Sequence, residues 1–294
     1  MLKKIALSLS LLGTAAFAED VTIETYRGAV SVAQAPQDVV VFDISALDTL
    51  DALGVQVKGT VAPLYVTYLD HVTAAPVGSL FEPDFEAVLE LDPDLIVVGG
   101  RSSKQTDAML EIAPTIDMTI WEDTVGQGLD RLAAFGEIFG KQDQAAQLKS
   151  DFEAKLARAQ SAVSGQGSAM IVMTNGPKVS AYGASGRFGW LHTALKLPEA
   201  VAEVEQATHG EAISFEFIRE ANPDILIVVD RLSAIGRPGD VAAVTLDNAL
   251  VRETNAWQSG KVIYLDSSAV YISGGGIQSM NRTLDQIIAT LSPS

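Results

Sequence analysis

The chain has 294 residues and contains no cysteine. A disulfide, a thiolate nucleophile and a sulfur-ligated metal site each need cysteine, so the sequence excludes all three. It also has no cysteine to which a lipid could be attached after export. We therefore expect no membrane anchor of that kind.

The chain also has few positively charged residues. Lysine and arginine number 20 against 37 aspartates and glutamates, which gives a formal net charge of −17. This balance disfavours nucleic acid and anionic membrane surfaces as partners. It does not exclude a small anionic ligand, because salt screens exposed charges beyond about 8–10 Å and a local arginine cluster can then dominate.

Long apolar runs are scarce as well. The run at residues 5–17 is too short to cross a bilayer as a helix, which argues against a membrane anchor. Two lysines precede this run, and a small-x-small cleavage pattern follows it just before Glu19. We interpret residues 1–18 as a cleaved signal peptide, which predicts a soluble protein in a bacterial periplasm.

What the sequence does contain is one internal repeat. Residues 84–101 return as residues 214–231 at an offset of 130 without a gap, and 7 of the 18 positions are identical. Average residue usage would give about one identity. Each copy has a capping residue, a short helix, a Pro-Asp turn, a buried strand and a final arginine. The repeat predicts two similar lobes.

Strands alternate with helices along both halves of the chain, which predicts α/β lobes with mostly parallel sheets. Between the halves, residues 126–163 are helix-forming with a weak point at Gly140 and Lys141. Beyond that point, apolar residues recur at spacings of three and four and predict a helix of about 20 residues, roughly 30 Å long. Its position between the repeats favours a connector over an ordinary covering helix.

These patterns predict an N-terminal lobe at residues 19–137, a connecting long helix at 138–165 and a C-terminal lobe at 166–294, with a ligand cleft between the lobes. Four further local predictions are strands at residues 55–62 and 114–120, a helix from Arg187 through Leu195 and a helix at residues 247–257.

Two arginines end the repeated strands. Arg101 and Arg231 lie where ligands bind in open α/β sheets, beyond the carboxyl ends of the strands. Arginine there offers fixed donors to carboxylate, phosphate or catecholate oxygens. A surface ion pair is the alternative for each arginine alone, and their repetition favours the ligand. Arg187 follows a glycine-rich loop and is a weaker candidate for anion binding.

His209 and Tyr271 are candidate metal ligands, because tyrosinate is a hard oxygen donor suited to Fe(III) and imidazole is a general ligand. Both residue types are also common in structural roles, which we expect for His71 and His192. The sequence has no His-Glu-x-x-His and no phosphate-binding glycine loop, and residues 183–187 miss the nucleophile-elbow spacing by one position. The residues alone thus predict an exported binding protein with an anionic ligand, and a periplasmic hydrolase is the rival class.

Four segments carry a resemblance to a known family. Residues 182–189, 209–216, 223–231 and 270–276 resemble the periplasmic substrate-binding proteins of iron-siderophore ABC importers, in the subgroup that binds catecholate siderophores. The resemblance extends over nearly the whole mature chain. It implies two α/β lobes joined by one long helix.

The resemblance also implies roles for single residues. Arg101, Arg187 and Arg231 match the family arginines that contact catecholate oxygens. His209 and Tyr271 match the residues that complete the Fe(III) shell when the siderophore is tetradentate.

Glu86 and Glu216 are identical across the repeat and match the acidic residues that dock the lobes onto the membrane permease. The alternative role for these two glutamates is compensation of the helix dipole, worth about 0.3–1 kcal/mol.

The implied function is that of a soluble periplasmic receptor that delivers ferric catecholate-type siderophores to an inner-membrane ABC transporter. Its partners would be the ferric siderophore and the permease, with no intrinsic cofactor, and the protein would be a monomer. Haem, cobalamin and a hydroxamate siderophore remain alternative ligands of the same fold.

Overall fold

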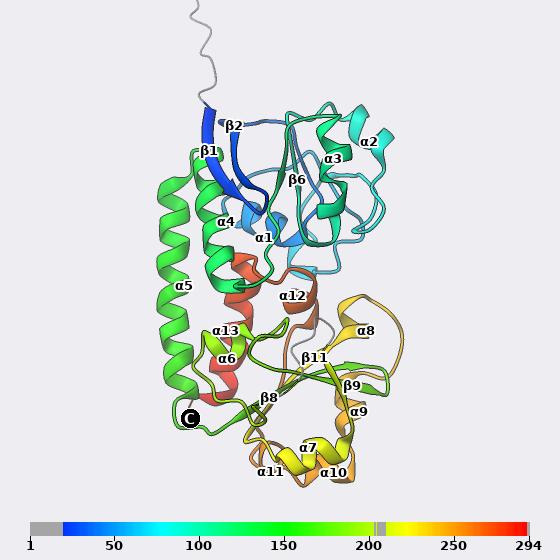
Figure 1. Ribbon diagram of the computed structural model, residues 1–294, viewed down its shortest axis with the longest axis vertical. Coiled ribbons are helices and arrows are strands. Elements are labelled where there is room, and N and C mark those ends of the chain that lie inside the picture. The colour runs from blue at the N-terminus through cyan, green and yellow to red at the C-terminus, as the bar shows by residue number, and fades with distance from the viewer. Residues whose placement is uncertain (1–19, 203, 205–209, 293–294) are drawn as a thin grey trace, which may run out of the picture.

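The structure is a computed structural model, and it describes residues 20–202, 204 and 210–292. Within these residues the chain forms two α/β lobes stacked along the long axis, with a long helix at one side of both (Figure 1). The predicted fold class is confirmed. The lobe boundaries given above stay a prediction.

The N-lobe has a five-stranded parallel sheet in the order β5-β4-β3-β6-β7. Its central strands consist of β-branched and leucine residues without exposed surface, as expected for a sheet covered on both faces. A separate hairpin precedes the sheet. The strands are β1 (Asp20–Thr25), β2 (Gly28–Ala33), β3 (Val39–Val41), β4 (Gly59–Thr60), β5 (Ala75–Pro76), β6 (Leu95–Val98) and β7 (Thr115–Asp117).

Short helices connect these strands. They are α1 (Ile44–Ala52), η1 (Thr67–Leu69), α2 (Phe85–Glu90), η2 (Gly100–Gln105) and α3 (Thr106–Leu110), where η denotes a 3₁₀ helix. The strands predicted at residues 55–62 and 114–120 are shorter than expected, because only β4 and β7 within them pair with a neighbour.

The C-lobe also has five strands, in the order β10-β9-β8-β11-β12. Here β8, β11 and β12 are parallel, whereas β9 pairs antiparallel with both β8 and β10. The sheet is therefore mixed, and the sequence predicted only its parallel part. The strands are β8 (Ala169–Asn175), β9 (Lys178–Tyr182), β10 (Glu211–Ile213), β11 (Ile225–Asp230) and β12 (Val262–Tyr264).

The helices of the C-lobe are short. They are α6 (Trp190–Thr193), α7 (Phe215–Ala221), α8 (Arg231–Ala234), α9 (Ala242–Leu246), α10 (Ala249–Arg252), α11 (Asn255–Gln258) and α12 (Ser267–Ile272). The single helix predicted at residues 247–257 is wrong. Helix α10 ends at Arg252, and the hydroxyl of Thr254 accepts the amide hydrogen of Trp257 to begin α11 instead.

The prediction that Arg187 begins a helix is also wrong. The chain makes two consecutive turns first, in which the Gly186 amide donates to Gly183 O and the Gly189 amide donates to Gly186 O, both at 2.9 Å. Helix α6 starts only at Trp190. Arg187 therefore extends from a glycine-rich turn, and its position owes nothing to a helix terminus.

Three longer helices run beside the lobes, namely α4 (Thr124–Ile138), α5 (Gln142–Val163) and α13 (Ile277–Leu291). Helix α5 packs along both α4 and α13 and lies beside both lobes (Figure 1). A contact of 2.7 Å between Lys155 Nζ and Asp285 Oδ2 joins α5 to α13. Within the described residues, no helix is both long enough and apolar enough to span a membrane.

The two copies of the repeat fold alike. Asp84 caps α2 by accepting the Ala87 amide hydrogen, and Ser214 caps α7 by accepting that of Phe217. After the Pro-Asp turn, each copy continues as a completely buried parallel strand, β6 or β11. The repeat thus places an arginine at the same edge of the sheet in each lobe.

Candidate ligand-binding site

Three arginines from both lobes meet at one tyrosine. Tyr271 belongs to α12, and its backbone carbonyl accepts Nη2 of Arg101 at 3.1 Å and Nη2 of Arg187 at 2.7 Å. Its hydroxyl accepts Nε of Arg231 at 3.3 Å. The structure therefore brings together four of the five residues that the sequence predicted for the ligand and metal site.

The aromatic ring of Tyr271 contributes as well. The guanidinium carbon of Arg187 lies 4.0 Å from the ring centroid, and that of Arg101 lies 5.4 Å away. Both distances fall within the range of cation–π attraction. The ring and the carbonyl together hold two like charges near each other.

Charge and burial shift the pKa values at this cluster. Burial of Arg187 lowers its pKa, and the neighbouring charge of Arg101 lowers it further. For Tyr271, burial acts to raise the pKa, but the hydrogen bond from Arg231 and the charges of all three arginines outweigh it, so the pKa is lowered. The three arginines therefore stabilise the phenolate form of Tyr271 relative to an ordinary tyrosine.

Within the described part of the chain, none of the three arginines forms an ion pair with a carboxylate. Arg231 has one further partner, the side-chain oxygen of Asn175 at 3.3 Å. Three cations share one neutral residue in a protein of net charge −17. Such a cluster attracts an anion carrying several charges.

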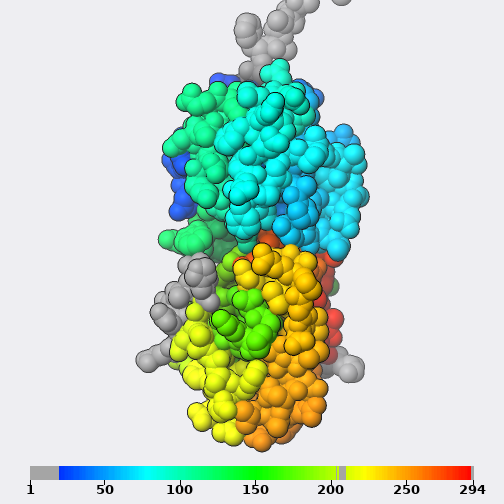
Figure 2. Space-filling model, turned by 90° about the vertical axis from the view of Figure 1, so that its right-hand side faces the viewer, coloured from blue at the N-terminus to red at the C-terminus, as the bar shows by residue number. Residues whose placement is uncertain are grey.

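A cavity of about 180 Å³ opens beside the cluster. Its lining residues come from both lobes and are Tyr65, Leu80, Phe81, Arg101, Arg231, Ile235, Arg237, Tyr271 and Ile272. Figure 2 shows the face on which the two lobes meet, with the golden segment around residues 231–240 reaching up to the N-lobe. The cavity lies between the lobes, where the sequence predicted a cleft.

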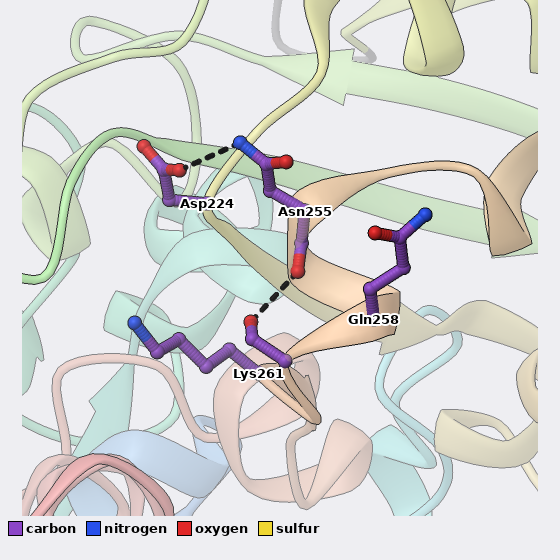
Figure 3. Close-up of a pocket in the computed structure, with 5 residues that line it drawn as sticks. Asp224, Asn255, Gln258 and Lys261 are labelled. Atoms are coloured by element: carbon purple, nitrogen blue, oxygen red, sulfur yellow. Dashed lines mark hydrogen bonds between the residues drawn. The ribbon is translucent and has the colours of Figure 1, made fainter.

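A second hollow, of about 350 Å³, lies elsewhere on the C-lobe and is lined by Asp224, Asn255, Gln258, Ser259 and Lys261 (Figure 3). Asp224 directly precedes β11 and Lys261 directly precedes β12, so the hollow is at the amino ends of these strands. Asp224 is already bonded to the Ser168 amide at 3.0 Å and to Asn255 Nδ2 at 3.0 Å. In α/β sheets ligands bind at the opposite end, which is the end that holds the arginine cluster.

His209 lies outside the described residues. Its predicted part in the metal site therefore stays a prediction. His71 and His192 both have structural partners, Asp51 Oδ1 at 2.7 Å and Leu197 O at 3.0 Å respectively.

Glu86 and Glu216 lie in the first turns of α2 and α7, and both are exposed. The pKa of Glu216 is lowered by its own backbone amide and by the hydroxyl of Ser214. The cyan and yellow segments that contain the two helices both reach the face shown in Figure 2. Each glutamate lies near the start of its copy of the repeat, whereas Arg101 and Arg231 end the two copies. Each copy therefore has an acidic start and a cationic end.

Sequence reasoning missed a buried carboxylate close to this cluster. Asp48 in α1 has no exposed surface, yet it accepts the amide hydrogens of Gln278 at 2.8 Å and Ser279 at 2.9 Å. These amides belong to the first turn of α13, whose own cap position is Gly276. A side chain of the N-lobe thus caps the helix that follows Tyr271.

Two hydroxyls complete the surroundings of Asp48, with Tyr68 donating at 2.6 Å and Ser273 at 3.3 Å. Burial raises the pKa of Asp48 to about 7, while these donors oppose the shift. A carbon atom added at Gly276 would lie 2.5 Å from the carboxyl carbon, so only glycine fits there. The one sequence signal was an aspartate between Leu47 and Leu50 on an apolar helix face.

Two lobes, a long helix beside them and an anion-attracting cavity between them define a solute-binding protein. The chain belongs to the periplasmic binding protein family, whose profile matches residues 39–269.

Among curated proteins, the chain is 36% identical to the petrobactin-binding protein YclQ of Bacillus subtilis, over 89% of this chain and 84% of that one. It is 31% identical to the ferric-anguibactin-binding protein FatB of Vibrio anguillarum, over 91% and 86%.

Solved structures of two similar proteins have the same fold. The crystal structure of YclQ superimposes with a TM-score of 0.87 at 34% identity, covering 94% of this chain and 100% of that one. The periplasmic catecholate-siderophore binding protein VctP of Vibrio cholerae gives a TM-score of 0.82 at 33% identity, with coverages of 94% and 100%.

Proposed function

We propose that this protein captures ferric catecholate-type siderophores in the periplasm and delivers them to an inner-membrane ABC transporter for iron uptake. The observation that carries the proposal is the cluster of Arg101, Arg187 and Arg231 around Tyr271, in which no arginine has a carboxylate partner among the described residues.

A ferric catecholate complex is an anion of several charges, and its outer surface presents phenolate oxygens. Guanidinium groups match it because they donate hydrogen bonds in a fixed fork and do not compete for the metal. Each charge-assisted bond contributes about 1.5–3 kcal/mol. Three arginines from two lobes can therefore provide most of the binding free energy of such a ligand.

Tyr271 is the proposed direct ligand of Fe(III) when the siderophore is tetradentate. Its lowered pKa favours the phenolate, which is a hard oxygen donor of the kind that Fe(III) prefers. We propose His209 as the second protein ligand. The iron arrives as part of the bound siderophore, so the proposed function needs no intrinsic cofactor and no catalysis.

The relatives support this choice of ligand, since their names specify petrobactin, ferric anguibactin and catecholate siderophores. By analogy with the family, we propose that Glu86 and Glu216 dock the two lobes to the permease. We further propose that residues 1–18 direct export and that the mature protein acts as a monomer with its lobes at 19–137 and 166–294.

Calorimetry with a panel of ferric siderophores tests the proposal. We expect tight binding of ferric catecholates, weaker binding of a ferric hydroxamate and no Soret band on mixing with haem. Absence of binding by every ferric catecholate, in both calorimetry and tryptophan fluorescence, would refute it.

A second measurement addresses the metal ligand. The variant Tyr271→Phe should change the visible charge-transfer band of a bound tetradentate ferric complex, because a phenolate ligand is lost. A hexadentate complex provides the control, since it leaves no coordination position open. An unaltered band with the tetradentate complex would show that Tyr271 is not an iron ligand.

A further inference from the structure

The two lobes line the cavity beside Tyr271 unequally. The N-lobe contributes Arg101 together with Tyr65, Leu80 and Phe81, which are aromatic or aliphatic. Phe81 has 58% of its surface exposed. The C-lobe contributes a further cation, Arg237, in addition to Arg231, and the uncharged residues Ile235, Tyr271 and Ile272.

The backbone places Arg237 firmly. Its amide donates to Leu232 O at 2.9 Å, and the Gly236 amide donates to Ser233 O at 3.1 Å, so the turn folds back on α8. Asp230 fixes both sides of this segment by accepting the Ser233 amide at 3.1 Å and the Ala242 amide at 2.9 Å.

The side chain of Arg237 is exposed and forms no ion pair or hydrogen bond with any described residue. An unpaired cation beside Arg101 and Arg231 adds to like-charge repulsion in the cavity. An anionic group of the ligand is what would offset it.

Arg237 lines the same cavity but takes no part in the hydrogen bonds and ring contacts that hold the other arginines to Tyr271. A ligand group that pairs with Arg237 would therefore be additional to the groups that the cluster holds. The lining of the cavity thus offers apolar side chains and one more cation. It favours a ligand with an apolar arm and a second, separate charge.

We propose that Arg237 is a specificity-determining residue that selects ferric catecholate siderophores carrying an ionised carboxylate away from the iron, with Tyr65 and Phe81 against the arm that bears it. The inference rests on the function proposed above and adds the substrate class. Arginine suits this role because it pairs with a carboxylate through two parallel hydrogen bonds.

The test uses two synthetic ferric bis-catecholates that share one linker and differ in a single group, a carboxylate or a neutral carboxamide. Dissociation constants are measured by fluorescence quenching for the wild type, Arg237→Gln, Arg237→Lys and Arg158→Gln. Arg158 is exposed on α5, away from the cavity, and removes the same unit of charge. It therefore controls for the long-range field.

We expect the wild type to bind the carboxylate complex about tenfold more tightly than the carboxamide complex, as for one partly exposed charge-assisted contact. Arg237→Gln should remove this preference and leave carboxamide binding within about twofold. Arg158→Gln should retain the preference, and Arg237→Lys should retain part of it. The preference should shrink as salt is raised.

Equal binding of both complexes by the wild type would overturn the inference while leaving the proposed function intact. So would a full preference that persists in Arg237→Gln. Failure of the wild type to bind either complex would instead overturn the proposed function, and the inference with it.

Discussion

The two copies of the repeat share a backbone and differ in what surrounds it. Helix α7 packs against α10, and its residues Phe215 and Phe217 are packed against the C-lobe core. Helix α2 buries only Val88 and leaves Leu89 60% exposed. The same helix is thus an integral layer of one lobe and a thinly attached edge of the other.

The residue before each arginine also differs. Asp230 is buried and caps α8, so Arg231 begins an α-helix. Its counterpart Gly100 has a φ of +51°, and its amide donates to Thr119 Oγ1 at 2.8 Å, so Arg101 lies in the 3₁₀ helix η2. The repeat therefore places each arginine at the end of its strand, and the residue before the arginine determines which kind of helix the backbone enters.

The lobes therefore contribute unequally to the site. The C-lobe provides Arg187, Arg231 and Tyr271, whereas the N-lobe provides Arg101 and an apolar wall. The C-lobe thus provides most of the positive charge of the site, and the N-lobe provides apolar lining that shapes the cavity. Four predictions test this contrast.

The largest effect should come from the residue that joins the unequal lobes. Asp48→Ala leaves two amides and two hydroxyls without their buried acceptor, and each costs about 1–3 kcal/mol. We expect the free energy of unfolding in urea to fall by about 3 kcal/mol or more. Asp51→Ala is the matched control on the same helix and should cost under about 1 kcal/mol, because its partners are partly exposed. Equal costs would mean that the lobes are not joined through Asp48.

The contrast in charge predicts unequal effects on ligand binding. Arg187→Ala should weaken binding of a ferric catecholate about 100-fold, and Arg101→Ala about 10-fold. Arg187 lies nearer the Tyr271 ring and makes the shorter bond to its carbonyl, so its loss disturbs both. Calorimetry measures both constants. A larger loss of affinity for Arg101→Ala would contradict the inference that the C-lobe provides most of the charge that binds the ligand.

The stability that Asp48 provides by joining the N-lobe to α13 should also depend on pH. Because the folded pKa of Asp48 is raised from 3.8 to about 7, its stabilising contribution is complete below pH 3.8 and is lost as the pH rises through 7. Asn has no such titration. The difference in free energy of unfolding between the wild type and Asp48→Asn should therefore fall by about 2 kcal/mol from pH 5 to pH 8. Parallel stability curves for the two proteins would contradict this.

The smallest effect concerns the repeated helices themselves. Phe215→Ser should lower the free energy of unfolding by about 1 kcal/mol, because the ring packs on the C-lobe core. Phe85→Ser, at the equivalent position, should cost under about 0.5 kcal/mol, because Phe85 is 37% exposed and packs on neither core. Thermal or urea unfolding of the two variants compares them directly. Similar costs would show that α2 is as well embedded as α7.

Much of the fold could be predicted from local sequence patterns. The repeat, the long helix α5 and the strand-end arginines were predictable, because helix period, caps and turn residues are written in short stretches of sequence. The antiparallel strands β9 and β10 were not, since a short strand is recognised by its partner and not by its own composition.

The site was predictable in part, for the same reason. Arg101, Arg187, Arg231 and Tyr271 stood in recognisable segments, whereas Asp48 acts on amides 230 and 231 residues away and Arg237 is marked only by its place in the cavity. The functional roles of the predicted residues stay predictions, that of His209 included.

The carbonyl of Tyr271 has a consequence for selectivity. In this arrangement two cations are already held by one neutral acceptor, and their mutual repulsion is only partly offset. A chloride or a monovalent carboxylate neutralises one guanidinium and leaves the others repelling, so it gains little. A ligand of three or more negative charges relieves all of the repulsion at once. We therefore expect the cluster to prefer a ligand of high negative charge to small monovalent anions.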